Sequence, residues 1–285
     1  YGITGKNFQL STSLRLQESL IVNTEPLYFS IQGLKSGQSN AQIESVAGKI
    51  QEYSLEELVR GRWPECTVAT TSSKWQDYTI DSSNVTIKPI DYPKINFIGS
   101  VHSEFGSVHL TSALDAIDLS GTLGVRGEVN VLPLLPENLR QQLPEYHFST
   151  LPYCKLQIQL DKQLRLNKFN YKAKSKNLKL GRIAFDSFAT SGNFDGTTLT
   201  VNSLSLDRGE QYLDVNLLWN TKVHSYQSAL RGFIIPNEYN EIMPTRWGSI
   251  FNDNFVFNSN SLLYGDFLIA GNVQPATETL FYGSV

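Results

Sequence analysis

Apolar and polar residues alternate one by one along much of the chain, and this two-residue period limits the fold more than any other feature. Segments 155–161, 198–201 and 213–217 each place an apolar side chain at every second position. In an extended strand such side chains lie on one face, whereas a helix would spread them around its axis. One apolar face and one wet face is typical of antiparallel sheets. The alternation therefore predicts a mainly β, antiparallel fold.

Residues that favour turns separate the alternating stretches. We expect connections at Asp195-Gly196, at 207–210 and at 191–193, where Gly or Asn can adopt positive φ. The strands then follow one another as a meander. The alternation slips by one residue near Asn202, which predicts a β-bulge at that point.

The composition agrees with a β-rich fold. Charged residues make up 18% of the 285 residues and aromatic residues 11%. The charged share is below the roughly 25% of typical domains. Uncharged polar and aromatic side chains suit sheet surfaces better than helices. The two cysteines, Cys66 and Cys154, allow one disulfide, but two free or buried thiols fit the sequence at least as well.

The charge balance speaks against nucleic acid as a partner. The net charge is −3, whereas a nucleic-acid-binding protein needs a basic face to neutralise phosphates. The most basic segment runs from Lys168 to Lys179 and alternates with apolar residues. It is typical of a strand with one solvated face, and the alternative is a contact with anionic lipid headgroups.

Three short helices are predicted, near 54–62, 136–143 and 236–243, and each is followed by a proline. Each also follows an apolar-x-Gly-x-apolar segment, centred on Gly48, Gly127 and Gly232. A fourth such segment, centred on Gly271, has no helix after it. The recurrence predicts a repeat of several strands closed by a glycine-containing strand and a short helix.

Sequence motifs for catalysis are missing. The chain has no nucleophile elbow, no phosphate-binding loop and no zinc-protease motif, and its four histidines do not stand at metal-ligand spacing. We therefore predict a protein that is not an enzyme and that needs no cofactor and no metal.

Two stretches resemble the AsmA/TamB-like superfamily of bacterial envelope proteins. One is 194–206 with the strands at 212–217 and 230–232, and the other is 119–129. Both resemble the family's repeated Gly-x-x-Leu-x-Val-x-x-Leu-x-Leu pattern, which contains no catalytic residue. The resemblance covers 110–285 well and the first 110 residues loosely. It implies an elongated, curved meander sheet that forms a β-groove with an apolar lining.

The resemblance also implies a function and a place in the cell. We expect a non-enzymatic periplasmic or cell-envelope segment that supports phospholipid transport between membranes or outer-membrane biogenesis. Its partners would be a phospholipid or other acyl-chain lipid and components of the inner and outer membranes. No signal peptide or long apolar run is present, so we expect a fragment of a longer protein, tethered to a membrane by a segment outside this chain.

The repeats predict an N-terminal part, 1–110, and a β-groove part, 111–285. Candidate groove-lining residues are the apolar members of the clearest alternating segments: Leu156, Ile158, Leu160, Leu199, Val201, Leu213, Val215 and Leu217. The same residues would also suit the core of an ordinary β-sandwich. The alternative function is therefore a sandwich module for carbohydrate binding or adhesion, with two sheets closed over one core.

Overall fold

The computed structural model describes residues 3–11, 14–17, 20–24, 26–36, 41–54, 56, 60–75, 78–89, 92–134, 145–162, 165–239, 262–272 and 279–284. The chain divides into two compact units. Unit 1 comprises Tyr1–Gly127 and Gln157–Leu166, and unit 2 comprises Glu128–Leu156 and Asn167–Val285. The boundary predicted between residues 110 and 111 separates repeats of the sequence and not compact units. It therefore stays a prediction.

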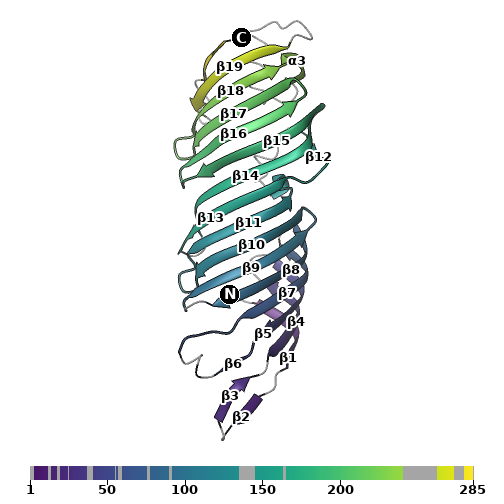
Figure 1. The fold of residues 1–285 in the computed structure, drawn as a ribbon, viewed down its shortest axis with the longest axis vertical. Helices are drawn as coiled ribbons and strands as arrows, with labels where there is room; N and C mark the ends of the chain where they lie inside the picture. Colours follow the sequence, from purple (N-terminus) through teal and green to yellow (C-terminus); the bar gives the residue numbers. More distant parts are fainter. Residues whose placement is uncertain are drawn as a thin grey trace. The chain divides into compact units, whose positions relative to one another are not determined.

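Unit 1 is built on an antiparallel sheet with the strand order β1–β4–β5–β7–β8–β9–β10. Its strands are β1 Ile3–Ser11, β4 Leu27–Ser36, β5 Ala41–Ile50, β7 Cys66–Trp75, β8 Tyr78–Pro89, β9 Lys94–Ser103 and β10 Gly106–Asp115. A small separate sheet joins β2 Leu14–Gln17, β3 Leu20–Thr24 and β6 Tyr53–Ser54. From β4 onward, successive strands of the main sheet are neighbours (Figure 1).

Unit 2 is also an antiparallel meander, with the strand order β12–β14–β15–β16–β17–β18–β19–β20. Its strands are β12 Tyr146–Phe148, β14 Arg165–Leu180, β15 Ile183–Phe194, β16 Thr198–Arg208, β17 Gln211–Asn220, β18 Ser225–Ile234, β19 Leu263–Asn272 and β20 Thr279–Ser284. Strands β11 Gly121–Val129 and β13 Tyr153–Asp161 contribute residues to both units, and Arg165 and Leu166 at the start of β14 belong to unit 1.

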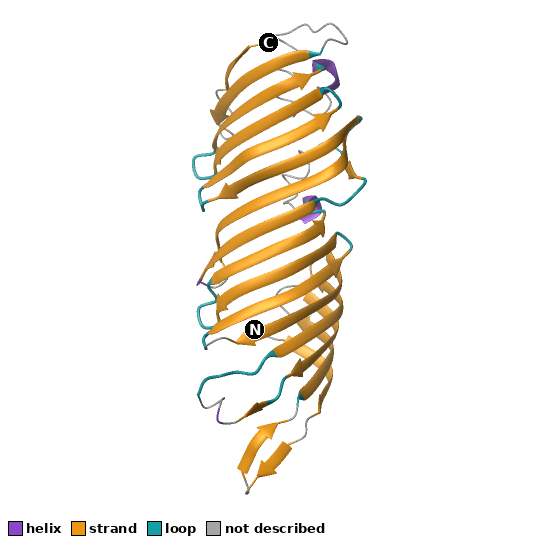
Figure 2. Ribbon diagram, viewed as in Figure 1, coloured by secondary structure: helices purple, strands orange, loops and turns teal. Residues whose placement is uncertain are grey.

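The predicted fold class is confirmed: the described chain is mainly β and its strands form antiparallel meanders (Figure 2). The structure describes little helix. The helix predicted near 236–243 begins as α3, Pro236–Tyr239, and its remaining residues lie outside the described ones. A short 3-10 helix, η1, spans Leu132–Leu134. The helix predicted at 136–143 lies outside the described residues. Of the helix predicted at 54–62, residues 55 and 57–59 lie outside them, Ser54 belongs to β6, and the Arg60 N–H donates a hydrogen bond to the Glu56 carbonyl as in a helical turn.

The predicted bulge and two of the three predicted connections are confirmed. The register between β16 and β17 shifts between Val201 and Leu204, on both sides of Asn202. Gly196 has φ +94°, and the Asp195 carboxylate accepts hydrogen bonds from the N–H groups of Thr197 and Thr198. Gly209, with φ +57°, turns the chain between β16 and β17.

The connection predicted at 191–193 is wrong, because these residues lie inside β15. A Cβ on Gly192 would come within 2.1 Å of the Thr200 carbonyl oxygen and 2.6 Å of the Tyr171 ring. Gly192 therefore lets a neighbouring backbone and an aromatic ring approach closely. A glycine inside a strand often marks such a close approach, and sequence alone does not separate it from a turn glycine.

Unit 2 contains two clusters of buried apolar side chains. The first consists of Leu178, Ile183, Phe185, Leu206, Ile234 and Tyr239. The second consists of Leu230, Phe267 and Ile269. Leu213 packs against both clusters, so that they are joined across β17. Burial of these side chains supplies much of the free energy that holds the meander together.

Candidate functional site

The alternating residues of β16, β17, β18 and β19 meet on one face of unit 2. In the strand register Leu204 lies opposite Val215, Val215 opposite Leu230, and Leu230 opposite Phe267. A neighbouring row runs from Val201 through Leu217 and Ser228 to Ile269. We call this surface the apolar face of unit 2; its members are Leu199, Val201, Leu204, Leu206, Leu213, Val215, Leu217, Trp219, Tyr226, Leu230, Phe267 and Ile269.

Exposure differs along the apolar face. Leu199, Val201, Leu213, Val215 and Leu217, all candidates from the sequence, are half-buried. Leu230, Phe267 and Ile269, nearer to β20, are only 7%, 8% and 2% exposed. The face is therefore closed toward β19, and over β16 and β17 it is partly accessible except at Leu206, which is 5% exposed.

Glycines make room for the Phe267 side chain on this face. A Cβ on Gly265 would lie 2.4 Å from the Phe267 ring, and a Cβ on Gly283 would lie 2.1 Å from it. The Phe267 ring therefore extends over the backbone of its own strand and of β20. This arrangement explains how the Phe267 side chain is almost fully buried on this face.

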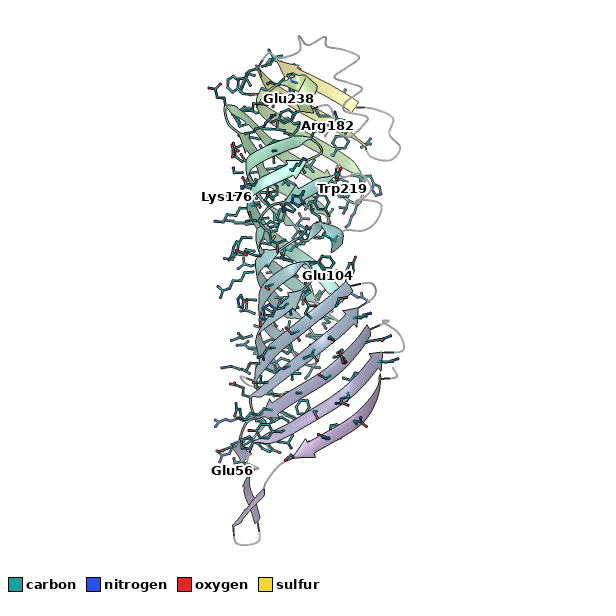
Figure 3. All side chains as sticks on the ribbon, turned by 90° about the vertical axis from the view of Figure 1, so that its right-hand side faces the viewer. Glu56, Glu104, Lys176, Arg182, Trp219 and Glu238 are labelled. Carbon is teal, nitrogen blue, oxygen red and sulfur yellow. The ribbon has the colours of Figure 1, made fainter. Side chains whose placement is uncertain are left out.

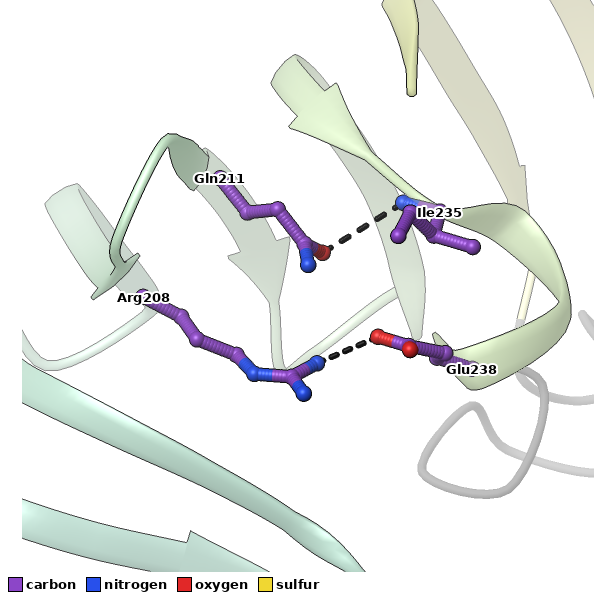
Figure 4. A network of polar contacts seen from close by, with 4 residues as sticks. All are labelled: Arg208, Gln211, Ile235 and Glu238. Atoms are coloured by element: carbon purple, nitrogen blue, oxygen red, sulfur yellow. Dashed lines mark hydrogen bonds and ion pairs between the residues drawn. The ribbon is translucent and has the colours of Figure 1, made fainter. Parts of the chain in front are cut away.

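Helix α3 closes one end of the first cluster. Its Glu238 forms an ion pair with Arg208, at the end of β16. The Gln211 side-chain carbonyl accepts a hydrogen bond from the Ile235 N–H at 3.4 Å (Figure 4). Both contacts tie α3 to the β16–β17 connection, and the Tyr239 ring meets the Phe185 ring edge-on at 6.0 Å between centroids.

The Tyr239 hydroxyl is buried without a hydrogen-bond partner among the described residues. Burial raises the pKa of Tyr239 from 10.0 to about 12. The folded state holds this proton more tightly than the unfolded chain, so the contribution to stability is complete below pH 10 and is lost as the pH rises toward 12. The buried phenol thus makes unit 2 sensitive to alkali.

We expect Tyr239→Phe to reduce this sensitivity. The variant keeps the ring and removes the titrating hydroxyl, so its free energy of unfolding should fall less between pH 10 and 12 than that of the wild type. Urea unfolding at pH 7, 10 and 11.5 measures the difference. Tyr282→Phe, at an 81% exposed position, is the control and should follow the wild type. Parallel curves for Tyr239→Phe and the wild type would contradict the prediction.

The opposite face of the unit 2 sheet carries the exposed lysines of β14, and we call it the charged face. Over β17 to β20 this face also exposes apolar side chains: Leu218, Phe233, Tyr264, Leu268 and Tyr282. Lys176 on β14 and Trp219 on β17 point to opposite sides of the sheet (Figure 3). The burial of β14 alternates accordingly, with Phe169, Tyr171 and Ala173 half-buried between exposed residues. At Asn177, with φ +54°, the alternation shifts by one residue, which turns Leu178 inward.

The three candidates on β13 also alternate as predicted. Leu156, Ile158 and Leu160 are half-buried, and the residues between them are exposed. Leu156 belongs to unit 2, whereas Ile158 and Leu160 belong to unit 1. The structure thus unites the five candidates of β16 and β17 on one face of unit 2. The assignment of all eight as lining residues stays a prediction.

Unit 1 has an apolar face of its own that the sequence did not reveal. One register row contains Phe29, Gly48, Val68, Val85, Gly99 and Leu110. A second contains Ile31, Val46, Thr70, Ser83, Val101 and Val108. Glycine, serine and threonine interrupt the apolar pattern within strands, and only the register shows that apolar residues of different strands fall in the same rows. Gly48, Gly99 and the hydrogen-bonded pair Thr70 and Ser83 interrupt these rows.

The described residues offer little that resembles a reaction centre. No group of three or more His, Cys, Asp or Glu side chains suited to a metal ion occurs among them. Cys66 and Cys154 are both free, and burial raises the pKa of each thiol, which keeps it protonated and a poor nucleophile at neutral pH. In the described part of the chain we find no helix long and apolar enough to cross a membrane.

Comparison of the chain with protein-family models, with curated proteins and with solved structures gave no match.

Proposed function

We propose that this chain is a non-enzymatic β-groove segment whose apolar face holds the acyl chains of a lipid, as in an AsmA/TamB-like protein of the cell envelope. Its role would be to support phospholipid transport between membranes or outer-membrane biogenesis. The observation that carries the proposal is the apolar face of unit 2, where aliphatic side chains from β16 and β17 are continuous yet half-buried.

The physical basis is the transfer of hydrocarbon out of water. Each buried methylene contributes about 0.8 kcal/mol, so a short stretch of acyl chain on such a face binds without any specific polar contact. Movement along the face would need only a continuous apolar path, because no bond is made or broken. A protein of this kind needs no catalytic residue.

The sheet topology supports this function over the sandwich alternative. A sandwich requires a second sheet packed over the apolar face. The described strands of unit 2 instead pair in one consecutive series, from β14 to β20. Within the described residues, unit 2 therefore supplies no second layer of strands for its own apolar face.

Val215→Asp in the full chain tests the proposal. A carboxylate at this position would meet acyl chains directly, so saturable binding of a fluorescent phospholipid analogue should weaken at least tenfold, the loss expected from about two methylenes. The matched control is Asn216→Asp, which adds the same charge to the exposed face of the same strand and should bind like the wild type.

Two further measurements keep the test decisive. Val215→Thr keeps the shape of the side chain, so if Val215→Asp fails to fold, a smaller loss of binding should still appear with threonine. Affinity for a series of fatty acids should rise by up to about fourfold for each added methylene. Absence of saturable binding by the folded wild type, or equal losses in Val215→Asp and Asn216→Asp, would refute the proposal.

A further inference from the structure

The charged face of unit 2 carries a concentrated strip of lysines. Between residues 168 and 179 the sequence contains five lysines and no acidic residue, although the whole chain has a net charge of −3. All five lysines lie on β14 and are exposed. Figure 3 shows Lys176 directed away from the side of the sheet that carries Trp219. The positive charge is thus gathered on the face that the proposed acyl-binding function does not use.

The residues that lie opposite Lys172, Lys174 and Lys176 on β15 are uncharged. Lys172 lies opposite Ser191, which lies opposite Ser203, and Lys174 lies opposite Ala189. Lys176 lies opposite Ser187 on β15, and Ser187 lies opposite Asp207 on β16. The Asp207 carboxylate is thus two strands from Lys176, at about 4.8 Å per strand, and it accepts a hydrogen bond from the Ser187 hydroxyl.

No ion pair of Lys172, Lys174 or Lys176 occurs among the described residues. Lys168 differs, because it lies near Asp195. Hydrogen bonds from the N–H groups of Thr198 and Thr197 lower the pKa of the Asp195 carboxyl, and the charge of Lys168 lowers it further. A row of lysines without carboxylate partners costs stability through like-charge repulsion, and an anionic ligand would relieve that cost.

A shallow depression lies in the middle of the strip. Its lining includes three ammonium groups, from Lys155, Lys172 and Lys174, and the hydroxyls of Ser191 and Ser203, whose oxygens are 3.0 Å apart. Ammonium and hydroxyl groups are the donors that recognise phosphate oxygens. The depression is open to solvent and belongs entirely to unit 2.

Aromatic and aliphatic groups border this charge. Tyr153 lines the depression and is 41% exposed, and Leu151, two residues earlier, is also 41% exposed. A tyrosine beside lysines suits the boundary between headgroups and hydrocarbon. Single-stranded nucleic acid would instead call for several stacking aromatic side chains along a basic groove, and a net charge of −3 would repel a long polyanion.

From the unneutralised lysine strip and the phosphate-suited depression within it, we infer that the charged face of unit 2 docks on an anionic membrane surface and binds its phosphate headgroups. The apolar face then stays turned away from that surface. This inference goes beyond the proposed function and stands on different residues, so either can fail alone.

Flotation or sedimentation of the full chain with vesicles tests the inference. The wild type should bind vesicles of phosphatidylcholine with 30% phosphatidylglycerol, roughly a physiological anionic share, and binding should weaken steeply with added salt. The variant Lys155→Gln/Lys172→Gln/Lys174→Gln should bind at least tenfold more weakly. The control, Lys74→Gln/Lys94→Gln/Lys222→Gln, removes the same charge at exposed positions elsewhere and should bind like the wild type.

Further arms identify the source of binding. Val215→Asp should leave vesicle binding unchanged, which separates this inference from the acyl-binding function. Inorganic pyrophosphate should compete with the vesicles only at millimolar concentration, because the membrane surface offers many phosphate groups to the protein at once. Equal binding to pure phosphatidylcholine, or an equal loss in the control variant, would overturn the inference. Binding of an oligonucleotide of 20 nucleotides, without any binding of vesicles, would also overturn the inference.

Discussion

Phe185→Ala should lower the free energy of unfolding of unit 2 by about 3–5 kcal/mol, the usual cost of removing a fully buried phenylalanine. The Phe185 side chain is only 1% exposed. It packs with Leu178 and Ile183 and meets the Tyr239 ring. Truncation would leave a cavity beneath α3, which the surrounding strands cannot fill because their hydrogen bonds fix the backbone.

Urea unfolding followed by far-ultraviolet circular dichroism measures this loss. Phe8→Ala is the matched control, because it makes the same truncation at a side chain that is 64% exposed on β1. We expect the control to change the free energy of unfolding by no more than about 0.5 kcal/mol. Similar losses in both variants would mean that Phe185 is not part of a packed core.

Gly232→Ala should destabilise unit 2 by about 1–3 kcal/mol, although it adds a single methyl group. A Cβ at this position would lie 2.0 Å from the Tyr212 carbonyl oxygen and 3.0 Å from the Leu213 Cα. Both are backbone atoms of the paired strand, so β17 and β18 must separate to admit the methyl group. The strain falls on the strand pair that carries Val215 and Leu230.

Ala229→Ser provides the comparison for Gly232→Ala. It also adds one heavy atom to β18, and its partners across the sheet are Asn216 and Leu268 on the charged face. The free energy of unfolding should change by no more than about 0.5 kcal/mol. If Gly232→Ala were as stable as Ala229→Ser, the close approach of β17 and β18 would not matter for folding.

The recurring glycines illustrate how far sequence reasoning reaches. The segments around Gly48, Gly127 and Gly232 were predicted as strands, and all three lie in strands. The reasons for glycine differ, however. A Cβ on Gly48 would meet the Phe29 ring, whereas a Cβ on Gly127 or Gly232 would meet the backbone of a neighbouring strand. The sequence pattern placed each glycine in a strand, and only the structure identified the group that lies close to it.

The candidate groove-lining residues also show what the sequence could not reveal. Alternation placed Val201, Leu213 and Val215 on one face of their strands, and they lie there. It did not reveal Leu230, Phe267 and Ile269, which form the buried part of the same face. Glycine and serine interrupt the apolar pattern of β18 and β19, so each strand by itself gives only a weak signal.

The amino-acid sequence by itself determined that this chain forms antiparallel strands with one apolar and one wet face, because side chains of a strand alternate with a period of two residues. It also determined where the main bulge falls. Tertiary structure alone decided which strands share a face, how deeply each side chain is buried, and that Lys172, Lys174 and Lys176 form no ion pair among the described residues. Those properties depend on the register between strands far apart in sequence, and bulges and glycine contacts fix that register only when the sheet assembles.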